Sequence, residues 1–346
     1  MKKILLILGL ACSAFCLSQK KEMKDAFKTK DYKEAVSLGQ EVLETTPEDF
    51  ETNLIISASY NSLGDFQNAL LYSGKLENIA KSDQEKSWTL MQLMAVNYGL
   101  GNKEAARKYY EKAKNIQQTG KAALELDNLG RLMGFDGFYD QWITVETENI
   151  IFHFESSINQ ETRNKIVKTR QNAFVKINEF FQANLPKKID FFVWGSNDVY
   201  NQFLKQSLGF TVPNYAISHN RLNQTAGHEI THNLSFWQGS IGKIKTALIN
   251  EGIGVCFDQS GNDKLQAARE AYKKFPLDIQ KVWAENQNIN SDILYPVSGA
   301  FVQTLIDYDK AKFLELNNNQ TYESAKKIYG DKIDSLIKRF TDKLKE

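Results

Sequence analysis

The spacing of apolar residues divides the chain into two regions. Between residues 19 and 138 the apolar positions are typical of one helix after another. Residues 143–154 (ITVETENIIFHF) alternate between apolar and polar types and are rich in β-branched and aromatic side chains, which predicts one or two strands. The change near Trp142 therefore marks a boundary between two domains, expected at residues 19–138 and 142–346.

The second region combines helices with a small sheet. Residues 161–181 have helical periodicity, residues 189–194 (IDFFVW) predict a short buried strand, and residues 215–218 are expected to add a strand at the sheet edge. After Gln224 nearly all of the sequence has a helical pattern. A small sheet followed by a helical half is typical of an α+β fold, so the expected class is α+β and mostly helical.

A repeated unit recurs within the N-terminal helices. Ala35, Ala69 and Ala106 lie 34 and 37 residues apart, and Gly64 and Gly101 come just before the second and third units. A small alanine lets the two helices of a hairpin approach closely. This period resembles the tetratricopeptide repeat, with two good repeats and a degenerate third. Such repeats imply a surface for a protein partner, and the alternative is a helical brace for the next domain.

The first eighteen residues resemble a secretory signal. Two lysines precede a short apolar run at residues 4–10 and small residues follow it, so cleavage is expected after Ser18. The apolar run is too short to span a bilayer, and the mature chain is expected to carry no transmembrane segment. The expected location is therefore the periplasm or the medium. The alternative is an outer-membrane lipoprotein acylated at Cys12 or Cys16.

Charge and cysteine content narrow the classes of function. Forty-three basic and 42 acidic residues give a formal net charge of +1, whereas nucleic-acid binding usually requires a clearly basic face. Nucleic acid is therefore not expected as a partner. The mature chain would keep only Cys256, so no intramolecular disulfide is expected. Cys256 is expected to be a small buried apolar residue.

A pair of histidines gives the first signal of chemistry. Within residues 225–234 (TAGHEITHNL), His228 and His232 are four positions apart, so on a helix both imidazoles leave the same face. That geometry lets two ring nitrogens reach one Zn²⁺. The Glu229 carboxylate would reach a water on the metal rather than the metal itself, which makes Glu229 the candidate general base.

A catalytic zinc site needs a third protein ligand. Glu251 follows His232 after 18 intervening residues, within Asn250-Glu251-Gly252. This interval is long enough for the first helix to end and for a second, antiparallel helix to bring Glu251 back. The sequence therefore predicts one Zn²⁺ per chain, held by His228, His232 and Glu251.

These motifs resemble those of the gluzincin metallopeptidases, in particular the peptidase MA-like group related to aminopeptidase N. The resemblance covers residues 142–346 and implies a thermolysin-like catalytic domain that hydrolyses peptide bonds. It also implies an oxyanion-stabilising tyrosine beyond the third ligand, and Tyr295, within residues 294–301 (LYPVSGAF), matches that segment. Asn250 and Thr231 are candidates to orient the ligands.

The sequence departs from the aminopeptidases at one point. Those enzymes bind the free amine of the substrate with an acidic motif ahead of the zinc helix, but residues 209–224 contain no Asp or Glu. The departure favours an endopeptidase or a different amine anchor, and both stay open here. An extended peptide is expected to pair with the edge strand at residues 215–218. His219 is expected to line the cleft or to lie on the surface.

The expected function is hydrolysis of a peptide or protein substrate by zinc-activated water, with Glu229 as general base and Tyr295 holding the oxyanion. One alternative is a non-catalytic interaction protein, in which the repeats bind a partner and the metal fold serves as a scaffold. The intact set of metal-site residues argues against that alternative. Another alternative is a zinc hydrolase that acts on a non-peptide substrate.

Overall fold

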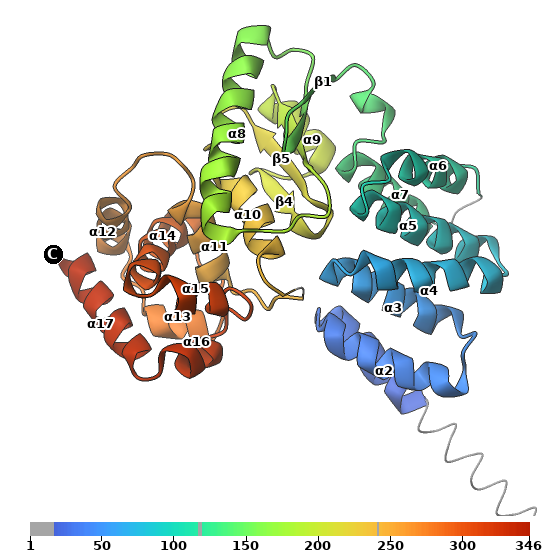
Figure 1. Cartoon of the computed structure of the whole chain (residues 1–346), viewed down its shortest axis with the longest axis horizontal. Coiled ribbons are helices and arrows are strands. Elements are labelled where there is room, and N and C mark those ends of the chain that lie inside the picture. Colours follow the sequence, from blue (N-terminus) through green and yellow to red (C-terminus); the bar gives the residue numbers. More distant parts are fainter. Residues whose placement is uncertain (1–16, 117–119, 241) are drawn as a thin grey trace, which may run out of the picture. The chain divides into compact units, whose positions relative to one another are not determined.

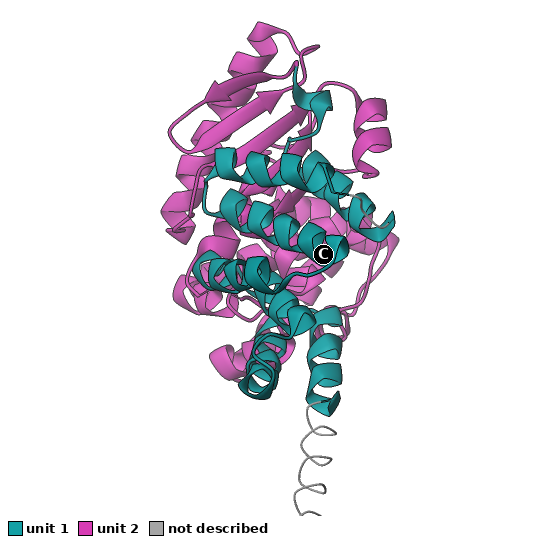
Figure 2. Cartoon of the chain, turned by 90° about the vertical axis from the view of Figure 1, so that its right-hand side faces the viewer, with its two compact units in different colours: residues 1–140 teal, residues 141–346 magenta. Residues whose placement is uncertain are grey.

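The computed structural model describes residues 17–116, 120–240 and 242–346. The chain divides into two compact units, Met1–Asp140 and Gln141–Glu346, which Figure 2 colours separately. Residues 1–16 of the predicted signal, which include Cys12 and Cys16, lie outside the described residues. Within the described ranges, none of the helices is both long enough and apolar enough to span a membrane.

The described part of the first unit is helical throughout. Its elements are a helix over residues 17–28, α2 (Tyr32–Thr45), α3 (Phe50–Leu63), α4 (Phe66–Ile79), α5 (Asp83–Gly99), α6 (Lys103–Lys114), α7 (Gly120–Leu132) and the 3₁₀ turn η1 (Gly137–Tyr139) (Figure 1). Asp31, Asp49 and Asp65 begin α2, α3 and α4, because each carboxylate accepts a hydrogen bond from a backbone amide of the first turn.

The repeated small residues lie at tight positions in this unit. Ala35, Ala69 and Ala106 are fully buried, and each helix from α2 to α5 packs against the next one along the chain. Gly64 and Gly101 have φ angles of 81° and 82°, in the left-handed region that glycine adopts without steric cost. Each glycine therefore ends one helix and lets the next begin within a few residues.

The second unit contains a five-stranded mixed sheet in the order β1-β2-β3-β5-β4. Its strands are β1 (Ile143–Glu146), β2 (Ile150–Phe154), β3 (Ile189–Trp194), β4 (Phe210–Val212) and β5 (Ile217–Arg221). β2, β3 and β5 run parallel, whereas β1 and β4 are antiparallel to their neighbours. A mostly helical chain with one small mixed sheet is an α+β protein, as expected from the sequence.

The predicted edge strand at residues 215–218 is wrong in position. Pro213–Tyr215 forms the 3₁₀ turn η2, and β5 begins at Ile217 as an internal strand between β3 and β4. The described sheet has two edge strands, β1 and β4, and β4 is the one that pairs with β5. With only three residues, β4 is too short for an alternating pattern to be recognised in the sequence.

Helices cover the sheet and form the rest of the second unit. They are α8 (Gln160–Phe181), α9 (Asn197–Leu204), α10 (His228–Trp237), α11 (Ala247–Cys256), α12 (Lys264–Lys274), α13 (Ile279–Ala284), α14 (Ser291–Tyr308), α15 (Lys310–Leu316), α16 (Tyr322–Tyr329) and α17 (Lys332–Lys345). One sheet face contributes Phe152 and Phe191 to a core that also contains Ile177 of α8 and Ile230 of α10. This apolar contact fixes α10, which carries both histidines, against the sheet.

Candidate metal centre

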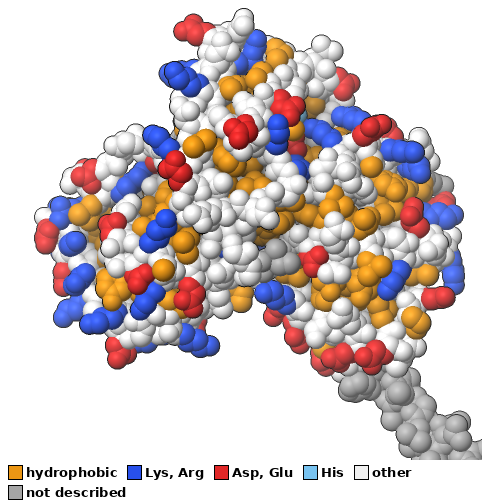
Figure 3. Space-filling view, viewed as in Figure 1, with side chains coloured by type: hydrophobic (Ala, Val, Ile, Leu, Met, Phe, Trp, Pro, Cys, Tyr) orange, Lys and Arg blue, Asp and Glu red, His pale blue; other side chains and the backbone are white. Residues whose placement is uncertain are grey.

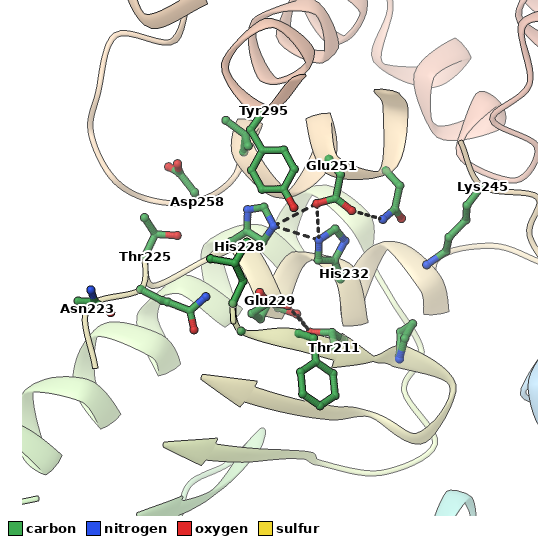
Figure 4. Close-up of a pocket in the computed structure, with 17 residues that line it drawn as sticks. Thr211, Asn223, Thr225, His228, Glu229, His232, Lys245, Glu251, Asp258 and Tyr295 are labelled. Atoms are coloured by element: carbon green, nitrogen blue, oxygen red, sulfur yellow. Dashed lines mark hydrogen bonds and ion pairs between the residues drawn. The ribbon is translucent and has the colours of Figure 1, made fainter. Parts of the chain in front are cut away.

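Two helices bring the predicted ligands together. α10 begins at His228, so His228 and His232 lie one turn apart and their Nε2 atoms are 3.2 Å from each other (Figure 4). Oε2 of Glu251, on α11, lies 3.6 Å from Nε2 of His228 and 3.8 Å from Nε2 of His232. Two imidazole nitrogens and one carboxylate oxygen therefore converge on one point. The three residues form a group that could hold a metal ion.

Two of the three ligand residues, His232 and Glu251, have the charge state in which they bind a cation. Burial, reinforced by the charge of His228, lowers the pKa of His232 to about 3. Burial alone would raise the pKa of Glu251, but the two neighbouring histidines lower it to about 2. Burial would likewise lower the pKa of His228, but Glu251 and Glu229 raise it. A neutral imidazole and an ionised carboxylate are the states in which these side chains bind metals, so a metal would have to displace a proton from His228.

Glu229 lies beside the ligand group without belonging to it. Its buried carboxylate accepts a hydrogen bond of 2.7 Å from the Thr211 hydroxyl, on the edge strand β4. The same hydroxyl lies 3.0 Å from Oγ of Ser218 on β5, so the sheet edge holds the carboxylate in place. Burial raises the pKa of Glu229 although His228 and Thr211 act in the opposite direction. A raised pKa makes a carboxylate a better proton acceptor near neutral pH.

Tyr295 faces the ligand group from a third helix, α14. Its ring stacks on the His228 ring, with the centroids 5.7 Å apart and an angle of 26° between the planes. Burial, together with the nearby carboxylate of Glu251, raises the pKa of Tyr295. The phenol therefore stays protonated and keeps a hydrogen to donate within the cleft (Figure 4).

Two glycines let α11 approach its neighbours. A Cβ atom on Gly252 would lie 2.6 Å from the backbone oxygen of Ser298 in α14. A Cβ atom on Gly254 would lie 2.7 Å from Cε1 of His228. Packing therefore explains the glycine at position 252. It allows the close contact between α11 and α14 that sets the position of the Glu251 carboxylate.

Of the two residues predicted to orient the ligands, Asn250 contacts a metal-ligand residue and Thr231 does not. Nδ2 of Asn250 donates a hydrogen bond of 3.1 Å to Oε1 of Glu251, so Asn250 contacts a ligand. Thr231 instead donates to the backbone carbonyl of Gly227, at 2.7 Å, and stabilises the start of α10.

The expectations for His219 are wrong, and Cys256 is only partly buried. His219 is fully buried rather than in the cleft or on the surface, because its ring stacks on Phe192 with centroids 4.4 Å apart. Nε1 of Trp194 donates to Nδ1 of His219 at 3.2 Å. Cys256 is half-buried, its Sγ lies 3.2 Å from Oε1 of Gln303, and burial raises the pKa of its thiol to about 12.

A cleft of about 490 Å³ opens over the ligand group, between β4 and the helices α10, α11 and α14. Beyond the ligand group and Glu229, its lining carries two charged residues, Lys245 and Asp258 (Figure 4). Asp258 is paired with Lys264, whose Nζ lies 2.6 Å from Oδ1. No pattern in the sequence pointed to Thr211 or Lys245, because Thr211 lies in a three-residue strand and Lys245 in an irregular connection.

Comparison with known proteins gives no family for this chain. No protein-family model matches it, and a search of curated proteins finds no match. The interpretation of the cleft therefore depends on the residues of this chain and on their geometry.

Proposed function

We propose that this protein is a zinc metallopeptidase of the gluzincin type. The proposal is carried by the convergence of the three ligand residues with Glu229 and Tyr295 in one cleft. A tetrahedral zinc ion with bonds of 2.0–2.1 Å holds its ligand atoms about 3.4 Å apart. The separations here are 3.2, 3.6 and 3.8 Å. Two imidazoles and one carboxylate are also a known ligand set of catalytic zinc.

The residues around the ligand group would supply the rest of a hydrolytic reaction. When bound, zinc would polarise the scissile carbonyl and lower the pKa of a water molecule. Glu229 would accept a proton from the attacking water and later deliver it to the leaving amine. Tyr295 would donate a hydrogen bond to the carbonyl oxygen as negative charge develops there. The Thr211 hydroxyl would keep the Glu229 carboxylate in position.

We propose a peptide substrate that binds in an extended form along β4. Phe210 and Thr211 of this strand line the cleft, and its outer edge has no strand partner in the described sheet. An extended peptide can add to such an edge through backbone hydrogen bonds. Because Asp258 is paired with Lys264, the described lining has no free carboxylate for a substrate amine away from the reacting centre. This favours an endopeptidase over an aminopeptidase.

Metal content is the test of this proposal. The wild-type chain and His232→Ala would be purified without chelator, and zinc would be measured by plasma mass spectrometry alongside peptide hydrolysis. We expect about one zinc per wild-type chain and loss of zinc and hydrolysis in the variant, because a ligand is removed. Zinc in neither protein would contradict the proposal and favour a repeat scaffold. Zinc without peptide hydrolysis would favour a non-peptide substrate.

For the first unit we propose tetratricopeptide-like repeats that bind a protein partner, with a helical brace as the alternative. The successive packed helices and the buried Ala35, Ala69 and Ala106 support the repeat assignment. We also propose export, which depends on the pattern of residues 1–18. N-terminal sequencing of the mature chain would test it. A start at Gln19 supports cleavage of a signal, and a lipid-modified cysteine would support the lipoprotein alternative.

A further inference from the structure

Lys245 is a cation in the cleft for which the proposed reaction has no use. It lies on the connection between α10 and α11 and lines the cleft together with His232 and Glu251. In Figure 4 its side chain extends from this connection toward the ligand group. The side chain is half-buried, so its charge is partly removed from water.

The ammonium of Lys245 has no anionic partner among the described residues. Nζ lies over the aromatic ring of Phe236, 5.2 Å from its centroid. On the outer face shown in Figure 3, by contrast, basic and acidic side chains are interspersed. The other charged residue of the cleft wall, Asp258, is already paired with Lys264. Lys245 is therefore the charge on the described cleft wall that is left for a ligand.

A neighbouring lysine provides a direct comparison. Nζ of Lys243 donates hydrogen bonds to Gln238, at 3.3 Å, and to Asn318, at 3.1 Å, and Lys243 does not line the cleft. Burial lowers the pKa of both side chains, to about 7 for Lys243 and to about 8 for Lys245. Lys243 has protein oxygens around its ammonium, whereas Lys245 has an open cleft. A cation held partly out of water gains most from an anionic partner.

The position of Lys245 decides where such an anion would bind. Lys245 lines the same cleft as His232 and Glu251, so its ammonium lies in the cavity into which the ligand group opens. In Figure 4, Lys245 and Asp258 lie on opposite sides of that group. An anion bound to Lys245 would therefore lie next to the reacting bond, on the side of the ligand group opposite Asp258.

We propose that Lys245 binds a carboxylate of the substrate next to the bond that is cleaved. This inference depends on the proposed peptidase function. A peptide offers two sources of such a group, an acidic side chain near the scissile bond or the C-terminal carboxylate. In either case the ammonium would form a charge-assisted hydrogen bond with it. Lys245 is thus a residue that determines specificity, and the reacting groups remain those described above.

Matched peptides distinguish the two sources. Quenched fluorescent peptides would carry Glu or Gln at each position flanking the cleaved bond, each as the free acid and as the C-terminal amide. A charge-assisted contact predicts a preference of about tenfold in kcat/KM, mainly through KM. A preference for Glu over Gln would identify a side-chain carboxylate. A preference for the free acid over the amide would identify the C-terminus.

Variants assign the preference to this residue. Lys245→Met should reduce the preference to less than about twofold, while hydrolysis of the neutral Gln amide peptide and zinc content stay close to wild type. Lys245→Arg should restore a preference, because it restores the cation. Lys243→Met is the matched control, since it removes a nearby lysine whose ammonium is bonded to Gln238 and Asn318 and does not line the cleft, and it should leave the preference unchanged.

Failure of this inference is distinguishable from failure of the proposed function. If the wild type cleaves carboxylate and amide peptides equally well, the role of Lys245 is overturned and the peptidase stands. If no peptide is cleaved, the peptidase proposal fails. Lys245 is then tested by calorimetric titration of the same peptides into the zinc-loaded Glu229→Gln chain. Tighter binding of the carboxylate peptides that is lost in Lys245→Met supports the inference, and equal or absent binding overturns it.

Discussion

The carboxylate of Glu229 is buried beside the ligand group, yet it is bonded to Thr211 rather than to either histidine. This arrangement leaves the carboxylate beside the metal site but not in it, as a general base requires. A change of this one side chain should therefore affect proton transfer without affecting metal binding.

Glu229→Gln tests that separation. Glutamine has nearly the same size and can still accept the Thr211 hydrogen bond, but it cannot accept a proton. We expect unchanged zinc content and a fall in kcat of about 10²–10⁴-fold, the usual contribution of a general base. Plasma mass spectrometry and peptide hydrolysis measure the two quantities. A variant with wild-type kcat would show that another group takes the proton.

Lys245 also makes the stability of the protein depend on pH. Burial lowers its pKa to about 8 from the ordinary value of 10.5, so between these values the unfolded chain binds more protons than the folded protein. Below about pH 8 the lysine is charged in both states, and the cost of burying its charge is fully present. As the pH rises above 8, the folded protein releases that proton, and the cost decreases.

Lys245→Met removes the buried charge altogether. We therefore expect a higher Tm than wild type at pH 7, and a smaller difference at about pH 10. Thermal unfolding of both zinc-loaded proteins at the two pH values measures this. A constant difference between Lys245→Met and wild type would contradict the assignment.

At the scale of the elements, α11 is the helix on which the centre depends. Gly252 allows it to approach the backbone of α14, and Gly254 allows it to lie against the ring of His228. One contact is with a rigid backbone oxygen and the other is with a side chain that can move. The two positions should therefore respond differently to the same added methyl group.

Alanine at each glycine tests this difference. Gly252→Ala should lower the free energy of unfolding by about 1–3 kcal/mol, the usual cost of overpacking, less any gain in helix propensity. Gly254→Ala should displace the His228 imidazole and weaken zinc binding by about 10–100-fold with a smaller loss of stability. Chemical denaturation and competition with a zinc chelator measure the two effects. Equal effects on zinc binding would contradict the role assigned to Gly254.

At the scale of the whole molecule, the two units have separate cores. The core cluster that includes the sheet and α10 lies within residues 141–346, and Val36, Ile56 and Tyr72 belong to a cluster in the first unit. The candidate metal centre lies wholly in the second unit. Zinc should therefore stabilise the second unit directly.

Differential scanning calorimetry with and without zinc tests this. We expect two transitions, of which one shifts to higher temperature with zinc. A free zinc concentration 100 times Kd would contribute about 2.7 kcal/mol to that unit. His232→Ala should abolish the shift and leave the other transition unchanged. A single transition that moves as a whole would mean that the two units unfold as one.

The features that could be predicted from the sequence are those set by local spacing. The helices of the first unit, α8, β2 and β3 follow from periodicity, because each depends on residues within one or two turns or pleats. The spacing of His228 and His232 works in the same way, since residues four apart on a helix share a face. The prediction of Glu251 as the third ligand needed one further assumption, that α11 returns antiparallel to α10.

The remaining features depend on which distant segments meet. The order of the strands decides that β4 is an edge strand and that His219 is enclosed between rings, and no spacing within residues 210–221 carries that information. Thr211 reaches Glu229 because β4 lies beside α10. Lys245 lines the cleft without a partner because of the path between α10 and α11. Burial and unpaired charge are properties of the assembled surface, so only the tertiary structure decides them.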